Sequence, residues 1–198
     1  MRFGRCRGSP TCVARLRRES FRVTASRYGG WMTTFDLRTL RLRSGDQARE
    51  RVEIAVEPLL LAGQAYEPRP NPAPAELSVT RASSGTVLEL ALEVALEGPC
   101  FRCLNDAELP LSLRLREYQA TRPEGEEERT EYLEGDRLDL SAWARDAIAL
   151  ALPDQILCRP DCAGLCPVCG KDLNAEPHEH AEESVDPRWA ALNQLRQE

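Results

Sequence analysis

The sequence lacks several features that membrane proteins and common enzyme classes need. It has no run of about 18 apolar residues, so we expect no membrane span. Only two histidines, His178 and His180, are available for acid–base chemistry. A P-loop, a glycine-rich dinucleotide fingerprint after a strand and a Gly-x-Ser-x-Gly nucleophile motif are all missing. We therefore expect a non-enzymatic protein with no small-molecule substrate.

The first 31 residues lack the apolar core of about 7 to 15 residues that a secretory signal contains, so we expect a cytoplasmic protein. They carry eight arginines against the single acid Glu19, a net charge of +7. Met32 directly precedes the first strand-like pattern. We interpret residues 1–31 as a basic disordered extension or a mis-assigned start, and residues 32–198 as the domain.

Residues 32–198 lack the excess of positive charge that direct RNA binding requires. They carry 18 basic and 31 acidic side chains, a net charge of −13. Proteins that bind RNA through its phosphates cluster lysine and arginine on one surface. We therefore expect a basic protein as the direct partner, because opposite charges speed the encounter of two proteins.

Alternation of apolar and polar residues predicts half-buried strands in the first half of the domain. The predicted strands occupy residues 35–43, 52–56, 77–79, 88–96 and 109–115. The last two are the clearest, and they flank a tip that holds Cys100 and Cys103. Four prolines within residues 68–74 predict an extended loop between strands, because proline cannot donate to a sheet.

The second half of the domain predicts helices separated by loops. Residues 121–138 are acidic and contain glycine, which indicates a solvated loop, or alternatively a docking strip for a basic partner. A helix follows, capped by Asp139 or Ser141 and ended by Pro153. A second helix begins at Asp186, and its apolar stripe is expected to dock on the domain.

These patterns predict the α+β class. The expected architecture is an antiparallel β-meander or small open barrel, with one or two helices and a C-terminal zinc-knuckle segment. The β-rich part would cover residues 32–120 and the acidic loop residues 121–138. Residues 139–198 would hold the helix, the cysteine-rich segment and the C-terminal helix.

Eight cysteines are far more than packing requires. In a chain that is not exported, such cysteines indicate metal binding rather than disulfides. Cys6 and Cys12 lie in the basic extension and are left out of the candidate site. The candidate zinc ligands are Cys100, Cys103, Cys158, Cys162, Cys166, Cys169, His178 and His180.

Two Cys-x-x-Cys pairs carry the strongest metal signal. Their spacing lets both sulfurs reach one ion at about 2.3 Å, and Gly170 permits the turn after the second pair. The partners of Cys166 and Cys169 are either Cys158 and Cys162 or the Cys100–Cys103 pair, so one or two structural ions are expected. The alternatives are reduced buried thiols or redox chemistry, which the turn-rich sequence after Cys169 disfavours.

The order of the motifs along the chain is distinctive. The first motif is Cys-x-x-Cys on a hairpin, and Leu152-Pro153 and a run with Gly-Leu-Cys-Pro-x-Cys-Gly at residues 164–170 follow it. Asp186-Pro187-Arg188 and Leu192-x-x-Leu195 complete the order. This order, over roughly residues 33–195, resembles the YceD family of large-ribosomal-RNA accumulation proteins. Many members have Cys-x-Cys where this chain has His178-x-His180, which implies that these histidines bind metal.

The resemblance implies a role in the synthesis, processing or stability of 23S ribosomal RNA, with no known catalytic activity. Some members lack the C-terminal cysteines, which implies that metal is not essential to the shared function. With the negative charge, this favours an assembly factor that contacts a basic ribosomal or ribosome-assembly protein, and 23S RNA only indirectly. The alternative is a structural zinc module that acts as an adaptor in transcription or another protein interaction.

Overall fold

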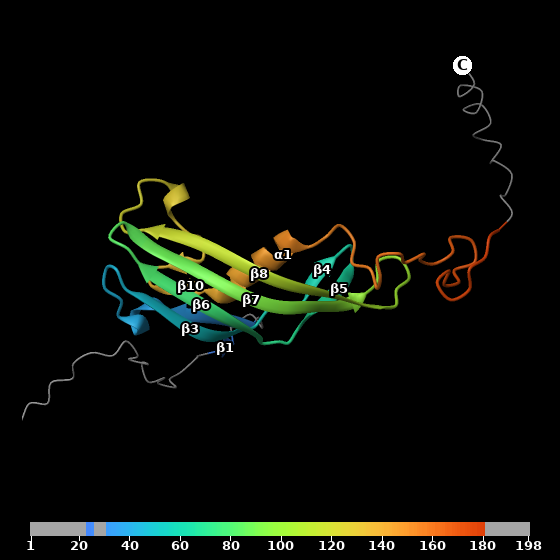
Figure 1. The fold of residues 1–198 in the computed structure, drawn as a ribbon, viewed down its shortest axis with the longest axis horizontal. Helices are drawn as coiled ribbons and strands as arrows, with labels where there is room; N and C mark the ends of the chain where they lie inside the picture. Colours follow the sequence, from blue (N-terminus) through green and yellow to red (C-terminus); the bar gives the residue numbers. More distant parts are fainter. Residues whose placement is uncertain (1–22, 26–30, 181–198) are drawn as a thin grey trace, which may run out of the picture.

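The computed structural model describes residues 23–25 and 31–180 (Figure 1). These residues form mostly antiparallel β-sheet with one α-helix, as the α+β class requires. None of their helices has the length and apolar character needed to cross a membrane. The helix expected from Asp186 lies outside the described residues, as do residues 1–22 of the basic extension.

The strands among the described residues pair into two sheets. One has the order β1-β2-β10-β9, and the other has the order β3-β6-β7-β5-β4, with β8 on the opposite edge of β7. Because β6, β7 and β8 are consecutive antiparallel neighbours, the predicted meander is present. The strands are β1 (Val23–Ala25), β2 (Trp31–Asp36), β3 (Gln47–Ile54), β4 (Leu59–Leu61), β5 (Gln64–Arg69), β6 (Ala73–Arg81), β7 (Gly85–Pro99), β8 (Asp106–Ala120), β9 (Leu133–Glu134) and β10 (Arg137–Asp139).

The hairpin of β7 and β8 is the longest feature of the fold. Each strand has 15 residues, and they pair from Gly85–Ala120 to Pro99–Asp106. Leu88, Leu90, Leu92 and Leu96 of β7 are buried, whereas the glutamates between them are exposed. This confirms the prediction of two long strands, with the turn at residues 100–105 at their end.

The prediction of a proline-rich loop is wrong at both of its ends. Pro68 lies in β5 opposite Leu96, and Pro74 lies in β6 opposite Glu53. Each proline pairs with one neighbouring strand only, which is where a sheet tolerates a residue without an N–H. Only the short connection around Pro70 and Pro72 remains, with a cis peptide bond before each of them.

The strand expected at residues 35–43 is wrong beyond Asp36. A 3₁₀-helix, η1 (Leu37–Leu40), begins there because the Asp36 carboxylate accepts a hydrogen bond from the Arg38 N–H at 3.0 Å. Short polar side chains of this kind compete with sheet pairing. Val23–Ala25 also differ from expectation, since they lie inside the predicted disordered extension and pair as β1 with β2.

The acidic segment is not a loop throughout. It contains a 3₁₀-helix, η2 (Glu126–Glu128), and its end forms β9 and β10. Leu138 of β10 is fully buried opposite Phe35 of β2, so burial of this one leucine draws the end of the segment into the first sheet.

The α-helix α1 (Leu140–Ala151) packs against β2, β3 and β8. Its buried face consists of Leu140, Trp143, Ala144 and Ile148. Asp139 is the N-cap, because its carboxylate accepts from the Ala142 N–H at 3.0 Å. The other expected cap, Ser141, instead donates to the Ala55 carbonyl and accepts from the Thr33 N–H.

We expect Asp139→Ala to lower the free energy of unfolding by about 1 kcal/mol, because the first turn of α1 loses its side-chain acceptor. Urea denaturation of the metal-loaded protein measures this change. Asp154→Ala, which removes an exposed acid beyond the helix, is the matched control and should leave stability unchanged. Equal stability of the Asp139→Ala protein and the parent would contradict the assignment of the cap.

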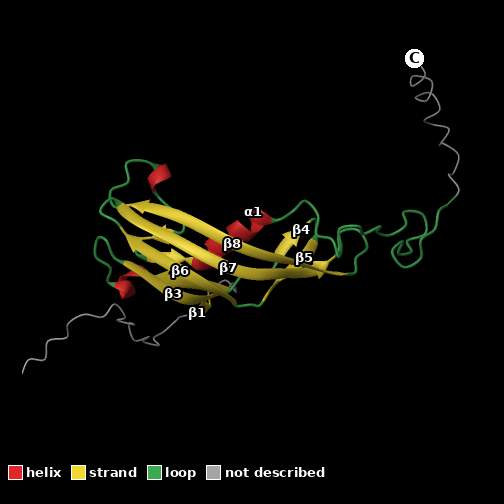
Figure 2. Ribbon diagram, viewed as in Figure 1, coloured by secondary structure: helices red, strands yellow, loops and turns green. Residues whose placement is uncertain are grey.

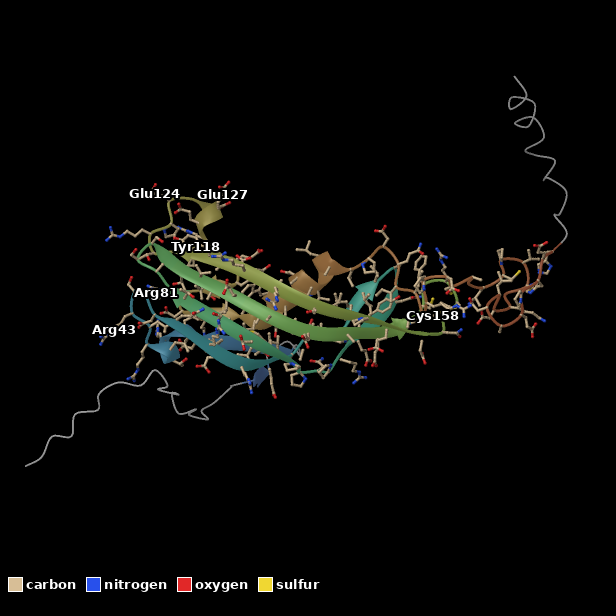
Figure 3. The ribbon with its side chains drawn as sticks, viewed as in Figure 1. Arg43, Arg81, Tyr118, Glu124, Glu127 and Cys158 are labelled. Atoms are coloured by element: carbon tan, nitrogen blue, oxygen red, sulfur yellow. The ribbon has the colours of Figure 1, made fainter. Side chains whose placement is uncertain are left out.

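The loop that contains η2 and the chain that follows α1 lie at opposite ends of an elongated molecule (Figure 1 and Figure 2). Glu124 and Glu127 lie near the end of the long hairpin at which Arg81 and Tyr118 are found (Figure 3). Cys158 lies at the other end, beside the hairpin turn (Figure 3). The fold thus places the cysteine-rich segment at the turn end of the long β7–β8 hairpin.

Candidate metal centres

The first cluster joins the hairpin turn to the chain that follows α1. It consists of Cys100, Cys103, Cys158 and Cys162, whose sulfurs all lie within 4.8 Å of one another. All of them except Cys158 are buried. A hydrogen bond from the Phe101 N–H to the Ile156 carbonyl, at 2.8 Å, holds the two stretches together.

The sulfur distances fit a tetrahedral zinc site. Four sulfurs at about 2.3 Å from one ion lie about 3.8 Å apart. Here the Cys100 and Cys162 sulfurs are 3.8 Å apart, and those of Cys103 and Cys158 are 3.6 Å apart. All four cysteines are free thiols. The cluster therefore matches thiolate coordination of a single divalent ion.

The second cluster is local in sequence and more exposed. It consists of Cys166, Cys169, His178 and His180, whose ligand atoms also lie within 4.8 Å of one another. Cys166 is buried, whereas Cys169 and His180 are exposed. The two imidazole rings stand edge to face with centroids 4.9 Å apart. Two thiols and two imidazoles form a common zinc ligand set.

The orientation of His178 suits a metal ligand. Its Nδ1–H donates to the Glu176 carbonyl at 2.7 Å, because a carbonyl only accepts. This leaves the Nε2 lone pair toward Cys169, whose sulfur is 3.0 Å away. A backbone carbonyl that fixes the ring through the other nitrogen is the usual support of a metal-binding histidine.

The two Cys-x-x-Cys turns have the same backbone hydrogen bonds. In the first, the Leu104 N–H donates to the Cys100 carbonyl at 3.0 Å, and the Cys100 N–H donates to the Asn105 carbonyl. In the second, the Gly170 N–H donates to the Cys166 carbonyl at 2.9 Å, and the Cys166 N–H to the Lys171 carbonyl. Both are therefore the same knuckle, with a left-handed residue after the second cysteine.

Backbone and side-chain groups of residues that are not ligands tie the two clusters together. The Leu165 N–H donates to the Arg102 carbonyl at 3.1 Å, and the Asn105 amide donates to the Asp172 carboxylate at 3.0 Å. The Asn174 amide donates to the Cys162 sulfur at 3.5 Å. Sequence reasoning missed Arg102, Asn105 and Asn174, because only the fold brings them beside the cysteines.

The pKa values of the thiols indicate how a bound cation would help to ionise each cluster. Burial raises the pKa of Cys100, but backbone N–H groups outweigh it and lower that pKa to about 6. Desolvation by the surrounding protein atoms and hydrogen bonds with the neighbouring thiols raise the pKa of Cys158 to about 12. The Cys169 and Val168 N–H groups lower the pKa of Cys166 to about 6. Each cluster thus holds an ionisable thiol, and a divalent ion removes the repulsion that opposes ionisation of the rest.

The grouping of the ligands differs from both expected arrangements. Cys166 and Cys169 meet His178 and His180, and neither of the other cysteine pairs. The Cys158–Cys162 stretch instead meets the hairpin turn. The reason is that the bridge between Leu165 and Asp172 turns the chain back on itself after the second knuckle, which brings the histidines to it.

The family model described as "Large ribosomal RNA subunit accumulation protein YceD" matches residues 88–196. The chain belongs to the YceD family. The matched residues include the long hairpin from Leu88 on, α1 and all eight candidate ligands of both clusters. The resemblance inferred from the order of the cysteine motifs is therefore confirmed.

Relatives of this YceD-family chain include proteins of several bacteria. An uncharacterized protein of Mycobacterium tuberculosis is 37% identical over 125 residues, which are 61% of this chain and 60% of the relative. One of Mycobacterium leprae is 30% identical over 61% of this chain and 57% of its own length. The uncharacterized YlbN of Bacillus subtilis is 32% identical over 49% of this chain and 58% of its own length. The matched part thus spans 60% or less of these relatives, and no solved structure matches the chain.

Proposed function

We propose that the chain is a non-enzymatic factor that supports the synthesis, processing or stability of 23S ribosomal RNA in large-subunit biogenesis. The family match over residues 88–196 carries this proposal, because the description of that family is accumulation of the large ribosomal RNA. The matched residues hold both cysteine clusters and the hairpin from Leu88 on. The proposed site of action is the cytoplasm.

The ligand sets support zinc as a structural ion in both clusters. Thiolate and imidazole ligands favour zinc over the harder cations, which prefer oxygen. Each cluster offers four protein ligands, which fills a tetrahedral shell and leaves no position for water or substrate. Ions without an open coordination position can stabilise the fold but cannot activate water. This supports an assembly factor over a metal-dependent nuclease.

The charge of the domain supports action through protein contacts. Residues 32–198 carry a net charge of −13, which opposes the approach of an RNA backbone. The same charge attracts a basic ribosomal or ribosome-assembly protein. We infer that such a protein is the direct partner and that 23S RNA is reached through it.

Deletion of the gene in the native host tests the proposed role. We expect the ratio of 23S to 16S RNA to fall, and the full-length chain supplied from a plasmid to restore it. Proteins that copurify with the tagged chain should include large-subunit ribosomal proteins. An unchanged RNA ratio would contradict the role in 23S RNA accumulation, and RNA polymerase as the main copurifying protein would favour a transcription adaptor.

Filter binding to protein-free 23S RNA tests whether the RNA contact is indirect. We expect residues 32–198, purified without the arginine-rich extension, to bind this RNA weakly at physiological salt, because few phosphates are neutralised. The measurement is the bound fraction as salt is raised. Tight binding that falls steeply with salt would show direct phosphate contacts and contradict the indirect route.

A further inference from the structure

The cysteine-rich end exposes apolar side chains on its knuckles. Phe101 and Leu104 belong to the first knuckle and are 42% and 55% exposed. Val168 belongs to the second knuckle and is 68% exposed. We call the exposed side chains of Phe101 and Leu104, three residues apart in the first knuckle, the knuckle face. Large apolar groups left in water at the end of an ordered element indicate a contact surface.

The backbone of Leu104 gives a second, independent reason to assign a role to this residue. Its φ is +62°, which lies in the left-handed region. Residues other than glycine rarely adopt this conformation, and among them asparagine and aspartate tolerate it best. The equivalent position of the second knuckle is Gly170, with a φ of +72° and nearly the same hydrogen bond. Glycine meets this requirement without strain. The first knuckle instead carries a leucine that strains the backbone.

Packing inside the protein does not account for that leucine. More than half of its surface stays in water, so its burial offsets little of the backbone cost. Persistent strain at an exposed residue is typical of positions that contact another molecule. The knuckle itself is held in this conformation by the hydrogen bond from the Leu104 N–H to the Cys100 carbonyl. A contact of the side chain with a partner would explain why leucine, rather than glycine, stands at this position.

The charges around the knuckle face favour a basic partner. The three cations nearby in sequence are already engaged. Arg159 pairs with Asp161, Lys171 pairs with Glu176, and the Arg102 guanidinium donates to the Cys162 carbonyl. Asp106, Asp154 and Glu179 are exposed, and no ion pair forms with them among the described residues. Residues 100–106 and 154–180, which hold both knuckles, carry six acids against three cations, so this end of the chain is negative.

We propose that the knuckle face is a docking surface for a basic protein segment that inserts apolar side chains against Phe101 and Leu104. The exposed acids would contact the lysines and arginines beside those anchors. The C-terminal residues 181–198 are a poorer occupant, because their four acids outnumber their two arginines and repel this negative end. The inference rests on the proposed function in one respect only, namely that the partner is taken to be a large-subunit ribosomal protein.

The test uses the full-length, metal-loaded chain immobilised on a support. The probe is the protein mixture stripped from purified large ribosomal subunits. Leu104→Gly and Phe101→Ser each remove one anchor, and Leu150→Ser removes an 89% exposed leucine of α1 as the matched control. We expect at least about tenfold weaker retention of a basic protein by the first two variants and none of this loss in the control.

Stability distinguishes docking from a structural role. Leu104→Gly relieves the left-handed strain, so its free energy of unfolding should equal or exceed that of the parent. Weaker binding at equal or higher stability supports the proposal. Unchanged retention by Leu104→Gly, or no retained protein on the parent chain, overturns it.

Two further outcomes also overturn the proposal by assigning another occupant. One is binding of single-stranded RNA that depends on Leu104. The other is a shift of Trp189 fluorescence in the Leu104→Gly chain alone, which would place the chain's own C-terminal segment on the face. The RNA ratio in the deletion strain is a separate readout, so a failed docking test leaves the proposed function standing on another surface.

Discussion

Removal of both metal ions is expected to unfold the cysteine-rich end while the long hairpin sheet stays folded. The chain from residue 157 to residue 180 contributes only Cys162 and Cys166 to the buried hydrophobic residues, so ligands and a few hydrogen bonds hold it in place. Structural zinc contributes about 10 kcal/mol or more on apparent peptide scales, comparable to the net stability of about 5–15 kcal/mol of a whole domain. The sheet keeps its own core of leucines.

Elemental analysis and hydrogen exchange measure this effect. We expect two zinc ions per chain, and one ion after either Cys162→Ser or Cys169→Ser, because these cysteines belong to different clusters. The double variant Cys6→Ser, Cys12→Ser is the matched control and should keep both ions. A chelated protein that holds no metal and protects residues 158–180 as before would contradict a structural role for the ions.

Gly98→Val is expected to lower the free energy of unfolding by about 3 kcal/mol, by overpacking a site that cannot relax. A Cβ at Gly98 would overlap the ring of Tyr66 and approach the Ala65 carbonyl to 2.9 Å. Tyr66 is 1% exposed, and its hydroxyl donates to the Pro99 carbonyl at 2.8 Å, so the ring has no free space to enter. Gly98 precedes Cys100 by two residues, so the same change is expected to disturb the first cluster.

Urea denaturation and metal content together check this prediction. Gly125→Ala is the matched control, because a Cβ there meets no atom within 4 Å and its φ is −141°. The control should unfold at the same urea concentration as the parent or slightly above it. Equal midpoints for Gly98→Val and the parent would show that Tyr66 moves aside.

Elements whose pattern repeats along the chain could be predicted from the sequence. The alternation from Leu88 to Leu96 placed β7, and the spacing of Trp143 and Ile148 with a cap at Asp139 placed α1. Gly170 was expected to permit the turn of its knuckle, and its φ of +72° shows that it does. In each case the local pattern and the tertiary packing favour the same conformation.

Features decided by partners far along the chain could not be predicted. Leu138 lies among acids, and only its burial against Phe35 shows that it belongs to a strand. The grouping of the eight ligands depends on the hairpin turn meeting the Cys158 stretch, about 55 residues away in sequence. Spacing identified the ligands, because ligand chemistry is local, but it did not assign them to clusters.

The continuous pairing of β7 with β8 fixes the distance between the two ends of the molecule. Fifteen residues at about 3.3 Å each give a length of about 50 Å between the acidic η2 end and the knuckles. Paired strands cannot slide past one another unless the hydrogen bonds between them break. The length of the hairpin is therefore constant while the sheet stays folded. The attachment points of two partners bound at these ends are therefore held about 50 Å apart.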